Sequence, residues 1–246
     1  MPCIYTFPNK KFVNVMYNFE EFKGKFNDIF DDIERFFLLE NPCLHSRLSF
    51  KKRKMYFGVT IGKNFCKNIA DDLREMSAHI DSDRSREEKM FNTYVHIFRD
   101  IEVDDPASFM KSVFKFVGKF DNERPAIDGV NIFAHDYKLS FSGKLWIPIL
   151  VTKSHKEITR RSPYSIIGFQ PDETFVYNKT KETDSYYKIR SATHKKIKKM
   201  CNGEYPQYMS KNSSGANFTQ FCGIDIQSNK KKVYRTLKTG RVTGQI

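Results

Sequence analysis

The sequence predicts a single α/β or α+β domain with a mixed central sheet flanked by amphipathic helices. Apolar residues at helical spacing alternate with short β-branched and aromatic runs, and the alternation closes on a strand-rich section. Hydrophobic residues make up 39% of the 246 residues, enough for a sizeable core. With no internal repeat or flexible linker, residues 1–40 (an N-terminal segment and helix) and 41–227 are expected to share one domain, and residues 228–246 to form a basic tail.

The first predicted helix runs from about Phe19 to Leu39, where phenylalanine and isoleucine recur at helical spacing. Asn18 followed by Glu21 is typical of a capping box at its start. Asn41-Pro42 ends the helix, because the residue before a proline disfavours helical geometry. Residues 42–49 are then expected to be turn-rich.

Two strands and two helices follow. The runs Met55–Ile61 and Asn92–Phe98 are predicted strands, and we expect His96 to be packed within the sheet. Apolar spacing over Phe65–Ile80 predicts a helix between them. Asp104-Asp105-Pro106 indicates the start of another helix, with proline in its first turn. Its inward-facing residues are expected to be Phe109, Val113, Phe116, Val117 and Phe120.

The last third begins with a predicted hairpin over Leu139–Val151 that turns at Ser142-Gly143. Ser165–Phe169 is a predicted strand, and the spacing over Tyr186–Met200 predicts a helix with a dense lysine face. Gly203–Gly223 is polar and rich in glycine and serine, which favours an irregular loop suited to a lid or a site wall.

Charge and cysteine content exclude several classes of protein. The five cysteines are widely spaced with no C-x-x-C, which argues against a zinc site, covalent c-type haem and a disulfide scaffold. Met1–Lys11 lacks the pattern of a signal peptide, and no apolar run approaches ~20 residues, so we expect a cytoplasmic protein without a membrane segment. The net charge of +13 favours a solvated basic surface, with nucleic acid bound only non-specifically.

One stretch, Leu145–Phe175, has a pattern found nowhere else in the chain. It places His155 and the pair Arg160-Arg161 in a polar turn between two apolar runs that are candidate core strands. A strand end is rigid and the loop after it is free to vary, which favours a binding site there. The alternative interpretation is an exposed basic hairpin tip.

Taken together, several segments resemble the YqcI/YcgG family over roughly residues 41–223. They are Pro42-Cys43, the helix from Phe65, the strand Tyr94–Phe98, the helix Phe109–Phe120, the hairpin Leu139–Val151, His155 with Arg160-Arg161, Gly168-Phe169-Gln170-Pro171 followed by Phe175, and the Gly203–Gly223 loop. The resemblance implies a haem-dependent monooxygenase that hydroxylates a nitrogen of an arginine-like guanidine or amine.

The chain departs from the family pattern at two places. The family usually has a histidine, a Ser-Arg pair and then Arg-Arg over a longer turn, whereas here only Arg160-Arg161 remain. The family also tends to place a histidine after a Phe-Asn-Pro phrase, where this chain has Gln170, Pro171 and Asp172. His155 is therefore the histidine that matches, and the departures bear on substrate choice more than on haem binding.

The resemblance implies a non-covalent haem b and dioxygen as co-substrate. Haem needs one axial protein ligand, and His155 at a strand end is the candidate, with Arg160 and Arg161 pairing the two propionates. Cys43 is the rival ligand, since a thiolate favours O–O cleavage. His45 and His135 are weaker candidates.

A cationic substrate needs a carboxylate in its pocket, and Asp172 and Glu173 are the candidates. The chain has no dinucleotide-binding glycine motif, so an external electron-donating reductase is implied. Two other classes of function stay open from the residues. One is a basic module that binds nucleic acid or an anionic partner without catalysis, and the other is a haem sensor or carrier without turnover.

Overall fold

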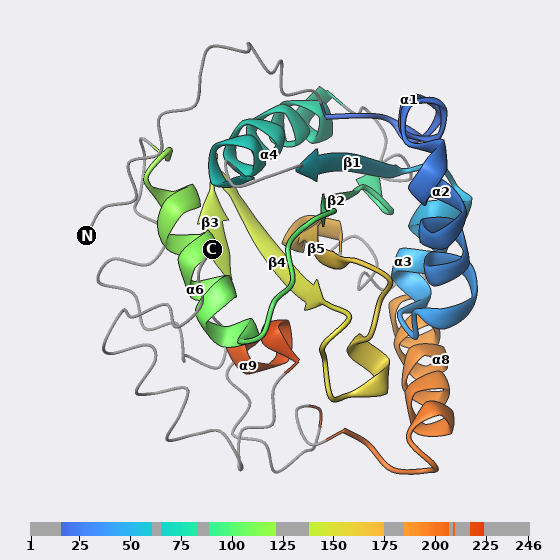
Figure 1. Cartoon of the computed structure of the whole chain (residues 1–246). Coiled ribbons are helices and arrows are strands. Elements are labelled where there is room, and N and C mark those ends of the chain that lie inside the picture. Colours follow the sequence, from blue (N-terminus) through green and yellow to red (C-terminus); the bar gives the residue numbers. More distant parts are fainter. Residues whose placement is uncertain are drawn as a thin grey trace.

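The computed structural model describes residues 16–60, 65–82, 89–121, 138–174, 185–206, 209 and 217–223. The predictions for the 122–129 loop, for most of the 203–223 loop and for the 228–246 tail lie outside these residues. Figure 1 shows a central sheet with helices on both sides.

The helices and strands agree largely with the expected order. The helices are α1 (Phe19–Lys25), α2 (Asn27–Arg35), the π-helix η1 (Phe36–Glu40), α3 (Leu44–Lys51), α4 (Phe65–Ser82), α6 (Pro106–Gly118), the 3-10 helix η2 (Ile158–Arg160), α8 (Ser185–Met200) and α9 (Asn217–Cys222). The strands are β1 (Met55–Thr60), β2 (Thr93–Phe98), β3 (Leu139–Phe141), β4 (Lys144–Val151) and β5 (Ser165–Pro171).

The five strands form one open mixed sheet in the order β1-β2-β5-β4-β3. β1 and β2 are parallel and are joined through α4, whereas the other pairs are antiparallel. The last strand in sequence, β5, lies between β2 and β4, and most of its residues are buried because helices cover both faces of the sheet. The predicted fold class, a single domain with a mixed sheet flanked by helices, is confirmed.

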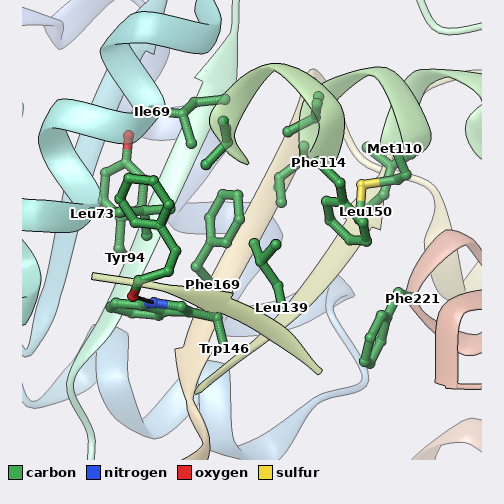
Figure 2. Close-up of a cluster of buried hydrophobic side chains, with 14 of the residues drawn as sticks. Ile69, Leu73, Tyr94, Met110, Phe114, Leu139, Trp146, Leu150, Phe169 and Phe221 are labelled. Atoms are coloured by element: carbon green, nitrogen blue, oxygen red, sulfur yellow. Dashed lines mark hydrogen bonds between the residues drawn. The ribbon is translucent and has the colours of Figure 1, made fainter. Parts of the chain in front are cut away.

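Each face of the sheet has its own apolar core. One core joins α4, α6 and α9 to the sheet, and Figure 2 shows Leu139, Trp146 and Phe169 from the strands facing Met110 and Phe114 from α6. The other core joins α1, α2, η1 and α3 to the opposite face. Burying the apolar stripe of each helix against the sheet is the main stabilising contribution in this arrangement.

Local signals in the sequence set several element boundaries correctly. The Asn18 side chain accepts from the Glu21 backbone, and the Glu21 side chain accepts from the Asn18 backbone, which completes the capping box. Asp105 caps α6, with Pro106 in its first turn. The hairpin turns at Ser142 and Gly143, both with positive φ, as a two-residue turn requires.

The single helix expected over Phe19–Leu39 is wrong in its continuity. Phe26 leaves helical geometry at φ −123° and ψ 43°, which ends α1 and begins α2. Gly24, just before the break, is a weak helix former. Phe22 and Phe26 are both buried in the same apolar core.

The turn expected over residues 42–49 is also wrong, because α3 begins at Leu44. The Asn41 side chain accepts from the Cys43 backbone amide just before α3 begins. The Ser49 hydroxyl donates to the carbonyl of His45 one turn earlier, which satisfies it within the helix. The Asn41-Pro42 stop signal therefore separates two helices instead of opening a loop.

Phe116 is exposed to 42%, against the expectation that it faces inward. Phe109, Val113 and Val117 occupy the buried stripe of α6, and Phe116 lies beside that stripe. Its ring is covered instead by the ammonium of Lys119, which lies 4.9 Å from the ring centroid.

Within the described parts of the chain, none of the helices is both long and apolar enough to span a bilayer.

Candidate functional site

The turn from Thr152 to Ser162 leaves the end of β4 and closes on itself before β5 begins. The backbone amide of Thr152 donates to the carbonyl of Arg160 (3.0 Å), and the amide of Ser162 donates to the carbonyl of Thr152 (3.2 Å). η2 lies inside this loop. The Ser154 hydroxyl donates to the carbonyl of Val103, which fixes the turn to the segment before α6. The turn that carries His155 is thus held in place by backbone hydrogen bonds, not an open hairpin tip.

His155 is buried in this turn, with 4% of its surface exposed. Its Nδ1 lies 2.8 Å from the hydroxyl of Thr152, and its Nε2 lies 2.8 Å from the carbonyl oxygen of Cys222. A carbonyl can only accept, so Nε2 carries the hydrogen and Nδ1 accepts from Thr152. Burial lowers the pKa of His155 to about 4, which keeps the imidazole neutral at pH 7.

The two arginines stand beside His155 and donate to backbone carbonyls. Arg160 is half-buried and its Nη2 donates to Gln220 at 2.7 Å. Arg161 is exposed, and its Nε donates to the carbonyl of His155 at 2.9 Å. The structure therefore brings together the three residues predicted for haem, and Arg161 braces the turn that holds the histidine.

The end of α9 covers this turn. Cys222 is fully buried, and burial raises the pKa of its thiol well above the usual value. Gly223 has a φ of +61°, and a Cβ placed there would lie 2.7 Å from the Cγ of Arg160. The absence of a side chain at Gly223 lets α9 approach Arg160 this closely.

His155 meets two of the three requirements of an axial haem ligand. The imidazole is neutral, and its ring orientation is fixed by Thr152. The third requirement is a nitrogen directed at iron, but Nε2 is directed at the carbonyl oxygen of Cys222. Ligation through Nε2 requires that this hydrogen bond be broken and that the proton move to Nδ1, where the Thr152 oxygen would accept it.

The rival candidates lie elsewhere. Cys43 is half-buried and precedes α3, at the surface that α3 shares with α8, where Leu44 donates to the Thr193 hydroxyl. His45 is buried, with Nδ1 2.9 Å from the side-chain nitrogen of Gln170 and a pKa lowered by burial to about 4. His135 lies outside the described residues.

Asp172 and Glu173 lie at the other end of the β4–β5 pair from His155. Because these strands are antiparallel, the end of β5 pairs with the start of β4, as Pro171 does with Trp146. Asp172 forms a salt bridge with Lys138 (2.6 Å), and Glu173 forms one with Lys144 (3.0 Å). A substrate held by these carboxylates would lie far along the sheet from the imidazole.

The contacts that position His155 include two that sequence reasoning missed. The Thr152 hydroxyl fixes the imidazole ring. From α9, the carbonyl of Cys222 accepts a hydrogen bond from His155, and the carbonyl of Gln220 accepts one from Arg160. A hydroxyl three residues before the histidine is a usable signal, but nothing local points to residues 220–222.

Among the described residues, no group of three or more His, Cys, Asp or Glu side chains could hold a metal ion.

Comparison with known proteins gives one match. The model of the YqcI/YcgG family matches residues 35–233, which include α3 through α9 and the whole His155 turn. No curated protein and no solved structure matches the sequence significantly. Since the family model spans most of the chain, from within α2 to beyond α9, this protein belongs to the YqcI/YcgG family.

Proposed function

We propose that this protein is a haem-dependent monooxygenase that hydroxylates a nitrogen of an arginine-like guanidine or amine, with His155 as the iron ligand. The observation that carries the proposal is the buried, neutral and oriented imidazole of His155 within the family segment. A histidine can ligate haem iron only through a neutral imidazole, and a hydrogen bond at its other nitrogen fixes the ring orientation. The proposed N-hydroxylation activity is inferred from the resemblance of the chain to the family.

The residues around the turn have distinct parts in this proposal. Thr152 would accept the Nδ1 hydrogen of His155, which orients the ring and raises the basicity of Nε2. Arg160 and Arg161 would pair the two haem propionates, since a guanidinium fork matches a carboxylate. Cys222 and Gln220, which now receive hydrogen bonds from His155 and Arg160, would release them. Bound haem would supply the activation of dioxygen, with electrons from an external reductase.

Haem binding is tested by absorption spectroscopy of the full chain titrated with haemin. We expect a Soret band at one haem per chain in the wild type and its loss or displacement in His155→Ala. Added imidazole should restore the wild-type band in that variant, because free imidazole replaces the missing ligand, and a merely misfolded variant would not respond. Cys43→Ala serves as the matched variant at the rival position, and there the band should not move.

Two outcomes would overturn His155 as the ligand. One is a Soret band that is identical in wild type and His155→Ala, and the other is a wild-type chain that binds no haemin. A band that moves only in Cys43→Ala would transfer the role to the thiolate.

Turnover is a separate measurement. The haem-loaded chain with dioxygen, a ferredoxin or flavin reductase and an arginine-like guanidine or amine should yield a product heavier by one oxygen atom, seen by mass spectrometry. A coloured protein that forms no such product with any amine or guanidine tested would be a haem sensor or carrier.

A second candidate function, a module that binds polyanions, is favoured by α8. This helix carries six basic residues and no acidic one. They are Lys188, Arg190, Lys195, Lys196, Lys198 and Lys199. Lys195 and Lys199 are exposed, whereas Lys196 donates to the carbonyls of Leu39 and Asn41. A row of exposed cations attracts phosphate backbones without sequence preference.

The polyanion hypothesis is tested by fluorescence anisotropy with labelled DNA at several salt concentrations. Lys195→Glu with Lys199→Glu should weaken binding and flatten its salt dependence, by about 0.9 in the logarithmic slope for each phosphate that the protein no longer neutralises. The matched control, Lys51→Glu with Lys52→Glu, changes the net charge equally at exposed positions outside α8. Equal weakening in both pairs would show that overall charge, and not α8, governs binding.

A further inference from the structure

A line of four polar side chains is buried between α4 and the parallel strands β1 and β2. Asp72 comes from α4, Tyr94 and His96 from β2, and Thr60 from the end of β1, and each is at most 3% exposed. The Tyr94 hydroxyl lies 2.5 Å from Oδ2 of Asp72 and 2.6 Å from Nδ1 of His96. Nε2 of His96 lies 2.6 Å from the hydroxyl of Thr60. The four groups are therefore joined end to end by three short hydrogen bonds.

Gly58 provides the space that this line occupies. A Cβ at this position would lie 2.3 Å from the Tyr94 hydroxyl, 2.4 Å from Oδ2 of Asp72 and 2.7 Å from Nδ1 of His96. Gly58 pairs with His96 across the parallel strands, so the missing side chain leaves room directly above the strand pair. The polar atoms meet where β1 has no side chain.

We propose that these four side chains form a proton-transfer relay from Asp72 on α4 to Thr60 at the carboxyl end of β1. Every hydrogen bond in the line can run in either direction, because tyrosine, threonine and neutral histidine each both donate and accept. The direction of the whole line is therefore set by whether Asp72 holds a proton. The relay does not depend on haem or on His155.

Both states of the relay balance in atoms and charge. When Asp72 is ionised, Tyr94 donates to it, Nδ1–H of His96 donates to Tyr94, and Thr60 donates to Nε2. When Asp72 gains a proton it donates to Tyr94, Tyr94 donates to Nδ1, and Nε2–H donates to Thr60. Passing from the first state to the second moves one hydrogen across each bond toward Asp72, and Thr60 takes up one proton from outside the line to replace its own. The reverse passage carries a proton from Asp72 toward Thr60 and releases one there.

The surroundings of Asp72 favour a change of state near neutral pH. Burial raises its pKa to about 7, opposed by the Tyr94 hydrogen bond and supported by the negative charges of Glu75 and Asp71 on the same helix. From β2 it faces Tyr94, whose pKa is raised well above its usual value by burial, and His96. The α6 residues in this core are mostly apolar, and they are Ala107, Phe109, Met110, Val113, Phe114 and Val117.

His96 is the natural reporter of the relay. Burial lowers its pKa to about 3, so the ring stays neutral throughout the range in which Asp72 titrates. A change at its nitrogens in that range must then be a change of tautomer and not a gain of charge.

The relay is tested by nitrogen NMR of the full chain labelled with ¹⁵N-histidine, titrated from about pH 5.5 to 8.5, on either side of the value for Asp72. The His96 signals are assigned by their loss in His96→Gln. We expect the majority tautomer to change from Nε2–H at low pH to Nδ1–H at high pH. In Asp72→Asn the side-chain amide does not titrate, so His96 should keep one tautomer over the whole range.

Tyr94→Phe should abolish the pH response by removing the central hydroxyl. Its matched control is Tyr56→Phe, which removes the hydroxyl of a neighbouring β1 tyrosine bonded to His79 of α4 at 2.5 Å and should leave the His96 response intact. The proposal is overturned if wild-type His96 keeps one tautomer over the whole range, or if its reversal persists in Asp72→Asn. The wild-type titration decides the matter even if a variant does not fold.

Discussion

At the scale of single residues, Gly58 is the more crowded of the two glycines in the described strands, because three polar atoms lie within 2.7 Å of the place a Cβ would take. Gly168, in β5, has the opposite environment, because a Cβ there would meet nothing within 4 Å. Both glycines are strand residues in the same sheet, so they form a matched pair.

Gly58→Ala should lower the free energy of unfolding by about 2 kcal/mol or more, since the methyl group has to displace a buried hydrogen-bond network. Gly168→Ala should be neutral or stabilising by up to about 1 kcal/mol, because alanine loses less conformational entropy in a strand than glycine. Urea unfolding followed by circular dichroism measures both. Equal effects of the two changes would contradict the close approach at Gly58.

Sequence reasoning placed His96 correctly in the sheet but did not find its partners. Tyr94 and His96 are two residues apart, which puts both on one face of β2. That spacing is readable from the sequence. The identity of the partners on α4 and β1 is not, because it depends on how α4 crosses the strand pair.

At the scale of elements, α6 is the helix whose start is most clearly encoded. Asp105 accepts from the backbone amides of Ala107 (3.1 Å) and Ser108 (3.2 Å) and from the Ser108 hydroxyl (2.9 Å). Asp104, one residue earlier, is exposed. Asp104 and Asp105 are adjacent and carry the same charge, but only the Asp105 carboxylate caps α6.

Asp105→Ala should destabilise the protein by about 1 kcal/mol, the usual cost of losing an N-cap. Asp104→Ala should change the free energy of unfolding by no more than about 0.5 kcal/mol, as expected for an exposed position. Thermal and urea unfolding of the two variants gives the comparison. A larger effect for Asp104→Ala would show that the cap is misassigned.

The two wrong helix predictions are of opposite kinds. Helical spacing of apolar residues continues through Phe26, so the spacing does not show the break there, whereas the Asn41-Pro42 stop signal does not show that a new helix begins at Leu44. The turn at Phe26 and the start of α3 are decided by packing of these short helices against the sheet and against η1. Weak local preferences are overridden by burial in such cases.

At the scale of the whole molecule, three of the histidines that the structure describes are buried and neutral. Burial lowers the pKa to about 4 for His45, about 3 for His96 and about 4 for His155, all below the ordinary value of 6.5. The unfolded chain takes up a proton at each as the pH falls below 6.5, whereas the folded chain does not. Each therefore favours unfolding in acid. Asp72 acts in the opposite sense, since its raised pKa makes the folded chain the better proton binder below about 7.

The three histidines destabilise the folded chain in acid and Asp72 alone stabilises it, so the free energy of unfolding falls from about pH 6.5 down to about pH 4. The slope corresponds to two protons, on the order of 2 to 3 kcal/mol per pH unit. Urea unfolding at a series of pH values measures it, and His45→Gln should reduce the slope by about one proton. Stability that stays constant down to pH 4.5 would show that these imidazoles are not neutral in the folded chain.

The sequence by itself determined what is local. The spacing of apolar residues identified the strands and the long helices, Asp105-Pro106 the start of α6, and Ser142-Gly143 the hairpin turn, because each rests on residues within a few positions of one another. It also pointed to the turn that holds His155.

Only the tertiary structure decided what lies next to what. It placed β5 between β2 and β4, set the carbonyl of Cys222 against His155 across 67 residues, and joined Asp72 to Thr60 through Tyr94 and His96. A periodicity says which face of an element is buried but not which other element buries it. That choice is made by the packing of the whole chain.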